Sequence, residues 1–222
     1  MGQITFKETF HDFAYSMFSV DAPLVNTLKL LVVNPGKLFR EFLSGKRKHY
    51  YKPVAFFILT TVMYLLIRSL LDYNPFQDTS IINVGDSSEY VDGRKLTLAR
   101  NFMLLNIDKL LFVFIFVLAL YLKLFFFKKY SLAEYVAIAF YLIGVYTIFA
   151  TLNMFYIHYT ASEMHAGALL LMFIYFTYAI VSTIKKNRIW VLIKLIPLYF
   201  LAIVSYALIA FGISYIIISI KS

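Results

Sequence analysis

The sequence contains no cysteine, so disulfides, thiolate metal sites and cysteine nucleophiles are all excluded. Charged residues are scarce too: they make up 15% of the 222 residues, whereas soluble domains carry about 25%. In their place, 61% of the residues are hydrophobic, which is more than the core of a soluble domain of this size can hold. These deficits exclude a soluble globular enzyme and a disordered tail. They favour a protein that crosses a membrane several times.

Catalytic signatures are missing as well. The sequence has no P-loop, no G-x-S-x-G elbow and no paired carboxylate motifs for lipid-phosphate chemistry. Charged residues inside a membrane are costly and usually functional, yet the apolar stretches hold almost none at mid-depth. Glu134 lies close to the start of one stretch, where water at the membrane edge reaches it. We therefore expect a protein that is not an enzyme and that binds no cofactor.

Five apolar stretches approach or exceed the length of about 20 residues that a membrane-spanning helix needs. They are residues 53–71, 110–127, 132–157, 167–184 and 195–220. The pattern predicts an all-α membrane protein with a five-helix transmembrane bundle. We expect a transmembrane domain at residues 53–222 with an outer loop at 72–109, preceded by a cytoplasmic amphipathic and basic region at residues 1–52.

The distribution of Lys and Arg predicts the orientation of these spans, because loops rich in basic residues stay in the cytoplasm. Most of the 21 basic residues precede the first span or lie near the second-to-third and fourth-to-fifth connections. These residues are Lys7, Lys29, Lys37, Arg40, Lys46, Arg47, Lys48, Lys52, Lys123, Lys128, Lys129, Lys185, Lys186, Arg188 and Lys194. Phe127, Tyr130 and Trp190 mark the same edges, as rings at a membrane interface do. We expect a cytoplasmic N-terminus and an external C-terminus.

The first fifty residues are predicted to form short helices at the membrane surface. One is an amphipathic helix over residues 4–19. Its apolar residues at helical spacing are Phe6, Phe10, Phe13 and Met17. A second helix follows an N-cap at Asp21, and its apolar stripe consists of Leu24, Leu28 and Leu31. A third begins at Asn34 and Pro35 and ends at a Gly45 C-cap.

A cluster of basic residues lies on the third helix and directly before the first span. Its members are Lys37, Arg40, Lys46, Arg47, Lys48 and Lys52. Such a cluster can simply anchor the topology. It can also bind anionic lipids of the inner leaflet or a partner protein, since each basic residue near an anionic surface gains about 1 kcal/mol. Nucleic-acid binding is not expected, because the patch is short and no recognisable module surrounds it.

Two further patterns have a functional and a structural interpretation. His158, Glu163 and His165 are zinc-competent ligands, but their spacing matches no helical zinc motif, so we expect solvated side chains and no metal. Small residues spaced four apart favour close helix packing, within one bundle or in a homo-oligomer. These pairs are Ala133 with Ala137 and Ala210 with Ser214.

Three features of the N-terminal third recur together in one known family. They are the Phe-rich segment at residues 5–13, the Pro-Gly helix start within residues 34–43, and Gly45-Lys46-Arg47 followed by Tyr50, Tyr51 and Pro53. On these features the stretch from Ile4 to about Leu66 resembles bacterial integral membrane proteins known as domain of unknown function 3667. The resemblance implies a bacterial inner-membrane protein of unestablished activity. The five-span layout is also similar to that of Yip1-type membrane proteins.

The resemblance implies no zinc site in this chain. Many relatives carry a zinc ribbon that ends in Cys-Gly-Gln, whereas the present sequence begins Met1-Gly2-Gln3 without a cysteine.

Three hypotheses of function follow. The first is a non-enzymatic bundle that organises lipids or partner proteins through its basic cytoplasmic face. The second is an oligomeric pore or permeability effector, in stress or phage defence. The third, a small-molecule transporter, predicts paired polar groups near the midplane, and the sequence does not provide them.

Overall fold

The computed structural model describes residues 22–73, 91–160, 167–184 and 187–221, and all regular structure within these ranges is helical. The helices are α2 (Ala22–Val33), α3 (Pro35–Leu43), the 3-10 turn η1 (Arg47–His49), α4 (Pro53–Leu70), α5 (Val91–Leu105), α6 (Ile107–Phe125), α7 (Leu132–Thr160), α8 (Gly167–Ile184) and α9 (Arg188–Lys221). The predicted all-α membrane bundle is confirmed. The amphipathic helix predicted at residues 4–19 lies outside the described residues.

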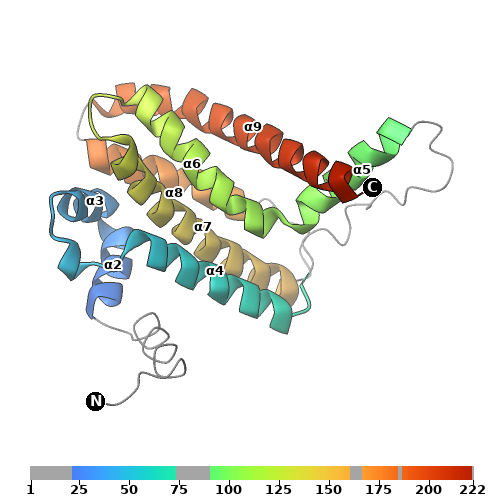
Figure 1. Cartoon of the computed structure of the whole chain (residues 1–222). Helices are drawn as coiled ribbons and strands as arrows, with labels where there is room; N and C mark the ends of the chain where they lie inside the picture. The colour runs from blue at the N-terminus through green and yellow to red at the C-terminus, as the bar shows by residue number, and fades with distance from the viewer. Residues whose placement is uncertain (1–21, 74–90, 161–166, 185–186, 222) are drawn as a thin grey trace, which may run out of the picture.

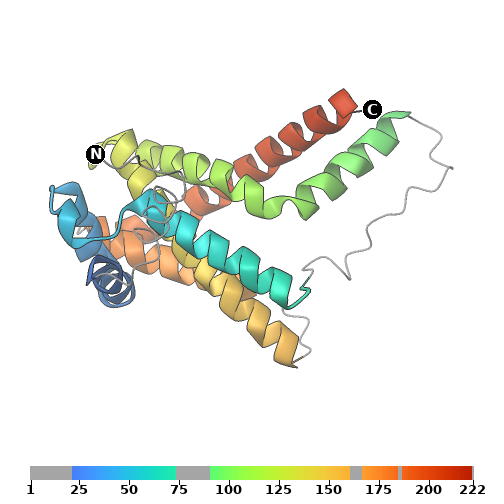
Figure 2. The ribbon, with the colours of Figure 1, turned by 60° about the horizontal axis from the view of Figure 1, so that its bottom comes forward.

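Helix α7 is the centre of the bundle. Every residue from Ile138 to Val145 is buried, and a helix that is apolar on all sides is expected to be enclosed by others. Helices α4, α6 and α8 pack directly on α7, while α9 lies against α6 and α8, and α5 lies against α9 (Figure 1). Figure 2 shows that α5 and the end of α9 diverge from α4 and α7.

Within the described ranges, four helical stretches are long and apolar enough to cross a membrane: Arg47–Leu70, Leu132–Thr160, Gly167–Ile184 and Arg188–Ile220. Helices α5 and α6 meet at an angle of 87°, and they supply a fifth crossing if the bent pair is one broken span. The protein is therefore a multi-pass membrane protein. The five predicted spans agree with this count if α5 and α6 together form one span.

The last helix begins earlier than its hydropathy predicted, at Arg188 instead of residue 195. Lys194 interrupts the apolar sequence, but its aliphatic stem can lie along a helix while its ammonium reaches the interface. In the structure Lys194 is half-buried, so the helix continues through it. Pro197 consequently lies inside α9 and not in its first turn.

The buried face of α2 differs from the predicted stripe. Leu24 and Leu31 are buried, but Leu28 is 39% exposed and Thr27 takes its place in the contact with the rest of the protein. The reason is polar: the Thr27 hydroxyl accepts a hydrogen bond from the backbone N–H of Tyr51 at 2.9 Å. A stripe chosen by hydrophobicity alone could not include it.

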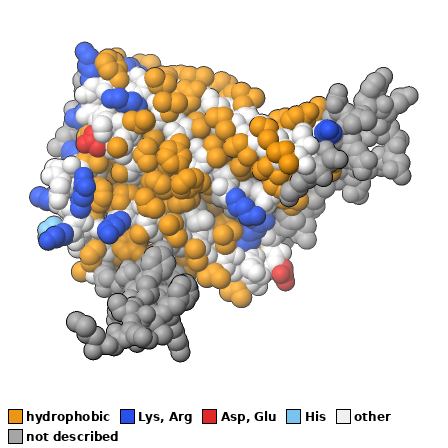
Figure 3. Space-filling model, viewed as in Figure 1, with side chains coloured by type: hydrophobic (Ala, Val, Ile, Leu, Met, Phe, Trp, Pro, Cys, Tyr) orange, Lys and Arg blue, Asp and Glu red, His pale blue; other side chains and the backbone are white. Residues whose placement is uncertain are grey.

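Charge and apolar surface are separated along the bundle. Hydrophobic side chains cover most of the face drawn in Figure 3, and many of its Lys and Arg residues gather at the end beside α3. A smaller group of basic residues lies toward the opposite end. We call the end that carries α3, the α6–α7 turn and the start of α9 the basic end.

Candidate functional site at the basic end

Three segments that are distant in sequence meet at the basic end. Helix α3 packs on the last turn of α8, where Arg40 reaches the carbonyl of Ser182. The start of α9 contacts the end of α6, where Lys194 donates to the carbonyl of Phe125 at 3.1 Å. Figure 1 shows the start of α4, the α6–α7 turn, the end of α8 and the start of α9 at this same end. The fold thus brings together described basic residues from three segments that are distant in sequence, among them Lys46, Lys128 and Lys194.

Helix α3 begins as the sequence predicts and docks through a glycine. The Asn34 side chain accepts from the backbone N–H of Lys37 at 3.0 Å, with Pro35 in the first turn. The N–H of Gly36 donates to the Ser182 hydroxyl at 2.9 Å. A Cβ atom at position 36 would lie 2.2 Å from the Ser182 carbonyl oxygen. Only glycine therefore allows α3 to approach α8 this closely without displacement.

Helices α2, α3 and α8 satisfy one another's terminal carbonyl groups, which have no partner within their own helix. Tyr175 of α8 donates to the carbonyl of Leu31 at 3.1 Å, and Tyr178 donates to that of Val33 at 2.6 Å. In return, Arg40 of α3 donates to the carbonyls of Ser182 and Thr183 at the end of α8. A cation at this position also opposes the partial negative charge of the helix C-terminus.

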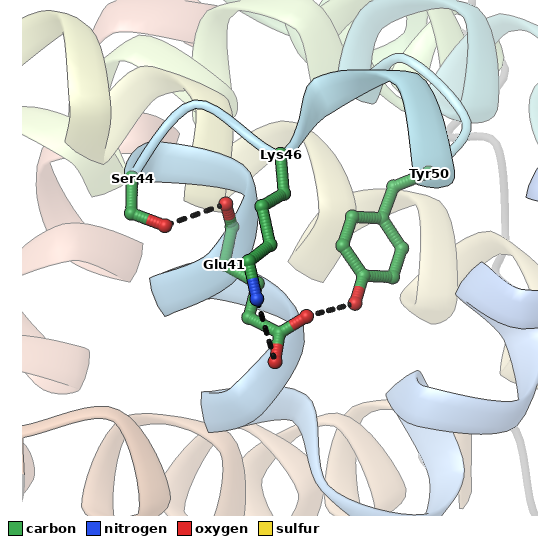
Figure 4. A network of polar contacts seen from close by, with 4 residues as sticks. All are labelled: Glu41, Ser44, Lys46 and Tyr50. Atoms are coloured by element: carbon green, nitrogen blue, oxygen red, sulfur yellow. Dashed lines mark hydrogen bonds and ion pairs between the residues drawn. The ribbon is translucent and has the colours of Figure 1, made fainter.

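One carboxylate, that of Glu41 at the end of α3, holds the segment between α3 and α4, which we call the Glu41 loop (Figure 4). Tyr50 donates to Glu41 Oε2 at 2.5 Å, Lys46 Nζ lies 3.9 Å from Glu41 Oε1, and the Ser44 hydroxyl donates to the Glu41 carbonyl at 3.0 Å. The hydrogen bond from Tyr50, helped by the charge of Lys46, lowers the pKa of Glu41 below its ordinary value of 4.5.

The loop then joins α4 at an aromatic cluster. Tyr141 of α7 donates a short hydrogen bond to the carbonyl of Tyr51. The rings of Phe39, Phe42 and Phe56 lie 5.8–5.9 Å from the Tyr141 ring, centroid to centroid. Both ends of the loop are therefore attached to buried residues, which fixes the position of the basic side chains between them.

The predicted lipid- or partner-binding residues divide into two groups. Five of them have exposed side chains around this loop: Lys37, Lys46, Arg47, Lys48 and Lys52. Arg40 is half-buried and directed at the end of α8. The five exposed residues form a surface that can meet an anionic partner, whereas the guanidinium of Arg40 is engaged within the protein.

A pocket of about 210 Å³ lies a short distance away, and sequence reasoning missed it. Its walls come from the α6–α7 turn, the end of α8 and the start of α9. They consist of Phe125, Phe126, Phe127, Lys128, Lys129, Ile184, Trp190 and Lys194. From the sequence, Phe127 and Trp190 are interpreted as interface anchors, and Lys128, Lys129 and Lys194 as topological charges. Two signals could have drawn attention to them: three phenylalanines followed by two lysines, and the four-residue spacing of Trp190 and Lys194 on one helix face.

Of the three weak zinc candidates, only His158 lies in the described part of the chain. His158 is exposed near the end of α7, with its ring against that of Tyr159. Glu163 and His165 lie outside the described residues. Among residues that the structure describes, no group of three or more His, Cys, Asp or Glu side chains could hold a metal ion.

Comparison with known proteins identifies one matching segment. Residues 21–65 match the family described as "Protein of unknown function (DUF3667)", which confirms the resemblance found in the sequence. The match spans α2, α3, η1 and most of α4, so it contains the Glu41 loop and the helices that exchange hydrogen bonds with α8. No curated protein and no solved structure matches the chain.

Proposed function

We propose that this protein organises anionic lipids in the bacterial inner membrane through its basic end, without catalysing a reaction. The observation that carries the proposal is the convergence of separate basic segments at one end of an apolar bundle. The exposed Lys and Arg residues lie on α3 and on the Glu41 loop, and this segment is attached to α8 through Arg40 and to α7 through Tyr51. They can therefore act on lipids as a group and not as independent, mobile charges.

The orientation follows from the same distribution of charge. Basic segments stay on the cytoplasmic side of a bacterial inner membrane, so the basic end faces the cytoplasm. The inner leaflet exposes anionic headgroups, and each Lys or Arg close to that surface gains about 1 kcal/mol. Five exposed basic residues on one short loop and its flanking helix provide a substantial preference for anionic lipid.

The proposal is tested with the full chain in which Lys46, Arg47 and Lys48 are replaced by Glu. The protein is reconstituted in mixed phosphatidylglycerol and phosphatidylcholine, extracted gently, and analysed by native mass spectrometry for retained lipid. We expect the wild type to retain phosphatidylglycerol in preference to phosphatidylcholine. In the triple variant this preference should fall more than about tenfold, because three attractive charges become repulsive.

The matched control reverses three basic residues toward the opposite end, Lys95, Arg100 and Lys109. This variant changes net charge by the same amount and should keep the preference of the wild type. If the variant of the Glu41 loop retains as much phosphatidylglycerol as the wild type, the proposal is wrong. The same spectra report subunit number, and a monomer that conducts no ions in vesicles would exclude the alternative of an oligomeric pore.

A further inference from the structure

The pocket between the α6–α7 turn and α9 combines cationic groups with aromatic walls. Lys194 Nζ lies 3.8 Å from the centroid of the Trp190 ring and 5.8 Å from that of Phe126. Lys128 Nζ lies 5.6 Å from the centroid of the Phe127 ring. Contacts between ammonium groups and ring faces are attractive, so these rings hold the lysines at the pocket without neutralising them.

Among the residues that the structure describes, no acidic side chain lines the pocket. Lysine is a compact point charge with three donors. The single hydrogen bond from Lys194 to Phe125 leaves two of its donors for a ligand. Lys128 and Lys129 have exposed side chains and, within the described ranges, no hydrogen bond or ion pair through their ammonium groups. Three positive charges therefore surround one small space.

Several backbone carbonyl groups around the pocket are already engaged. A free carbonyl oxygen would repel a negative ligand, but four of those in the α6–α7 turn accept hydrogen bonds. Lys194 binds the carbonyl of Phe125, and Lys123 binds those of Phe127 and Tyr130 at 2.7 and 2.9 Å. The Phe126 carbonyl accepts from the hydroxyl of Tyr135 at 2.9 Å. The carbonyl oxygens of Phe125, Phe126, Phe127 and Tyr130 are thus occupied by cations or donors.

The remaining walls are apolar and lie where the apolar surface of the bundle begins. Ile184 is buried, whereas Phe127 and Trp190 are exposed. A volume of about 210 Å³ is far larger than the roughly 10–15 Å³ that one water molecule needs. A small tetrahedral anion with its ester-linked carbons fits such a space, and lysine is a common phosphate binder. Basic pockets between spanning helices on the cytoplasmic side suit lipid headgroups.

We propose that this pocket is a binding site for a phosphate-ester anion, provided by the headgroup of an anionic lipid. Lys128, Lys129 and Lys194 bind the phosphate, and Trp190 and Phe127 contact the carbon chain beside it. The proposal rests on the proposed function and deepens it: the Glu41 loop gathers anionic lipid, and the pocket holds one headgroup at a defined position.

The chain offers a direct reporter of this site, because Trp190 is its single tryptophan. Lipids brominated on their acyl chains quench a tryptophan that they contact. The full chain is reconstituted with brominated phosphatidylglycerol or with brominated phosphatidylcholine at equal mole fraction, and Trp190 fluorescence is measured. A Trp190→Phe variant supplies the blank. We expect about a tenfold preference for phosphatidylglycerol at the wild-type site.

The principal variant is the double substitution K128A/K129A, which removes two exposed side chains and leaves the bonds of Lys194 and Lys123 in place. Each lysine removed accounts for roughly fivefold, so the tenfold preference should disappear in this variant. The matched control K95A/K109A removes two charges toward the opposite end, outside both proposed lipid-binding surfaces, and should keep the quenching preference. A separate titration with soluble glycerol phosphate identifies the source of the anion.

Each outcome decides the proposal. Selective quenching by phosphatidylglycerol that K128A/K129A loses and K95A/K109A keeps supports the lipid site. A response of Trp190 to glycerol phosphate, lost in K128A/K129A and without lipid preference, supports the phosphate site with a soluble ester as its source. Equal quenching by both lipids together with no response to glycerol phosphate overturns it. If native mass spectra still show phosphatidylglycerol enrichment in that case, the proposed function stands and only the pocket assignment fails.

Discussion

The N-terminal helices and the C-terminal helix are attached to the bundle in different ways. Helices α2 and α3 exchange hydrogen bonds with α8 through the ends of all three helices. Helix α9 packs against α6 and α5 largely through its length, and 17% of its apolar stretch is buried, compared with 56% in α7. Its contact with α6 includes a hydrogen bond between the hydroxyls of Tyr121 and Ser205 at 2.6 Å.

This difference follows from where the two regions lie. A long spanning helix satisfies its backbone internally, so it needs only apolar side chains toward lipid. Short helices at the membrane edge have many terminal N–H and C=O groups relative to their length. Specific partners must satisfy those groups, and α8 supplies them through Tyr175, Tyr178 and Ser182. The short helices therefore depend on exact positions, whereas α9 tolerates most apolar substitutions.

The strongest test of this contrast is a pair of glycine substitutions. Gly36→Ala places a Cβ atom 2.2 Å from the Ser182 carbonyl oxygen. Overpacking of this kind costs about 1–3 kcal/mol, and the displaced hydrogen bond adds about 1 kcal/mol. For a chain of this size we expect a loss of roughly 5–10 °C in Tm, measured by thermal unfolding in detergent.

The matched control is Gly212→Ala in α9, where a Cβ atom meets nothing within 4 Å. Alanine is preferred to glycine inside a helix by up to about 1 kcal/mol, so this variant should keep or slightly raise the Tm. Equal losses in both variants would contradict the contrast between the two regions.

Arg40→Ala should produce the second largest effect. It removes a charged donor from the carbonyls of Ser182 and Thr183, and hydrogen bonds of this type contribute about 1.5–3 kcal/mol. The control Lys37→Ala changes an exposed residue on the same helix and should alter the free energy of unfolding by less than about 0.5 kcal/mol. Loss of retained lipid in Arg40→Ala without loss of thermal stability would show instead that Arg40 binds lipid directly.

The smallest effect concerns Glu41 and depends on pH. Because its pKa is lowered in the folded protein, Glu41 contributes stability above pH 4.5, and this contribution disappears as the pH falls through the folded value. The difference in Tm between wild type and Glu41→Gln should therefore be largest near neutral pH and shrink below pH 4.5. A difference that stays constant with pH would mean that the charge of Glu41 is irrelevant.

Local features of this fold could be predicted from the sequence. The N-cap of Asn34 and the starts of α4, α7 and α8 agree with the predicted residues, because caps, prolines and apolar length act over a few positions. Gly45 follows the C-cap residue of α3 and has a positive φ of 103°. Glycine is the residue favoured at a helix end that needs this backbone conformation.

The candidate site could not be predicted, because it depends on contacts between distant residues. Arg40 and Ser182 are 142 positions apart, and Lys194 and Phe125 are 69 positions apart. Hydropathy and charge place such residues near the ends of predicted spans but do not pair them. The same limit explains why Arg40 was grouped with its exposed basic neighbours, and why the pocket lysines were interpreted only as topological charges.

The exchange of hydrogen bonds between α3 and α8 has a consequence for biosynthesis. Because α3 is synthesised long before Ser182, the N-terminal helices have no partner on α8 while most of the protein is inserted. If α8 entered the membrane backwards, Ser182 would emerge on the opposite side, and Gly36 and Arg40 would have no partner. Their docking therefore requires that α8 is inserted in one direction, so a contact of the N-terminal helices depends on the insertion of a helix made much later.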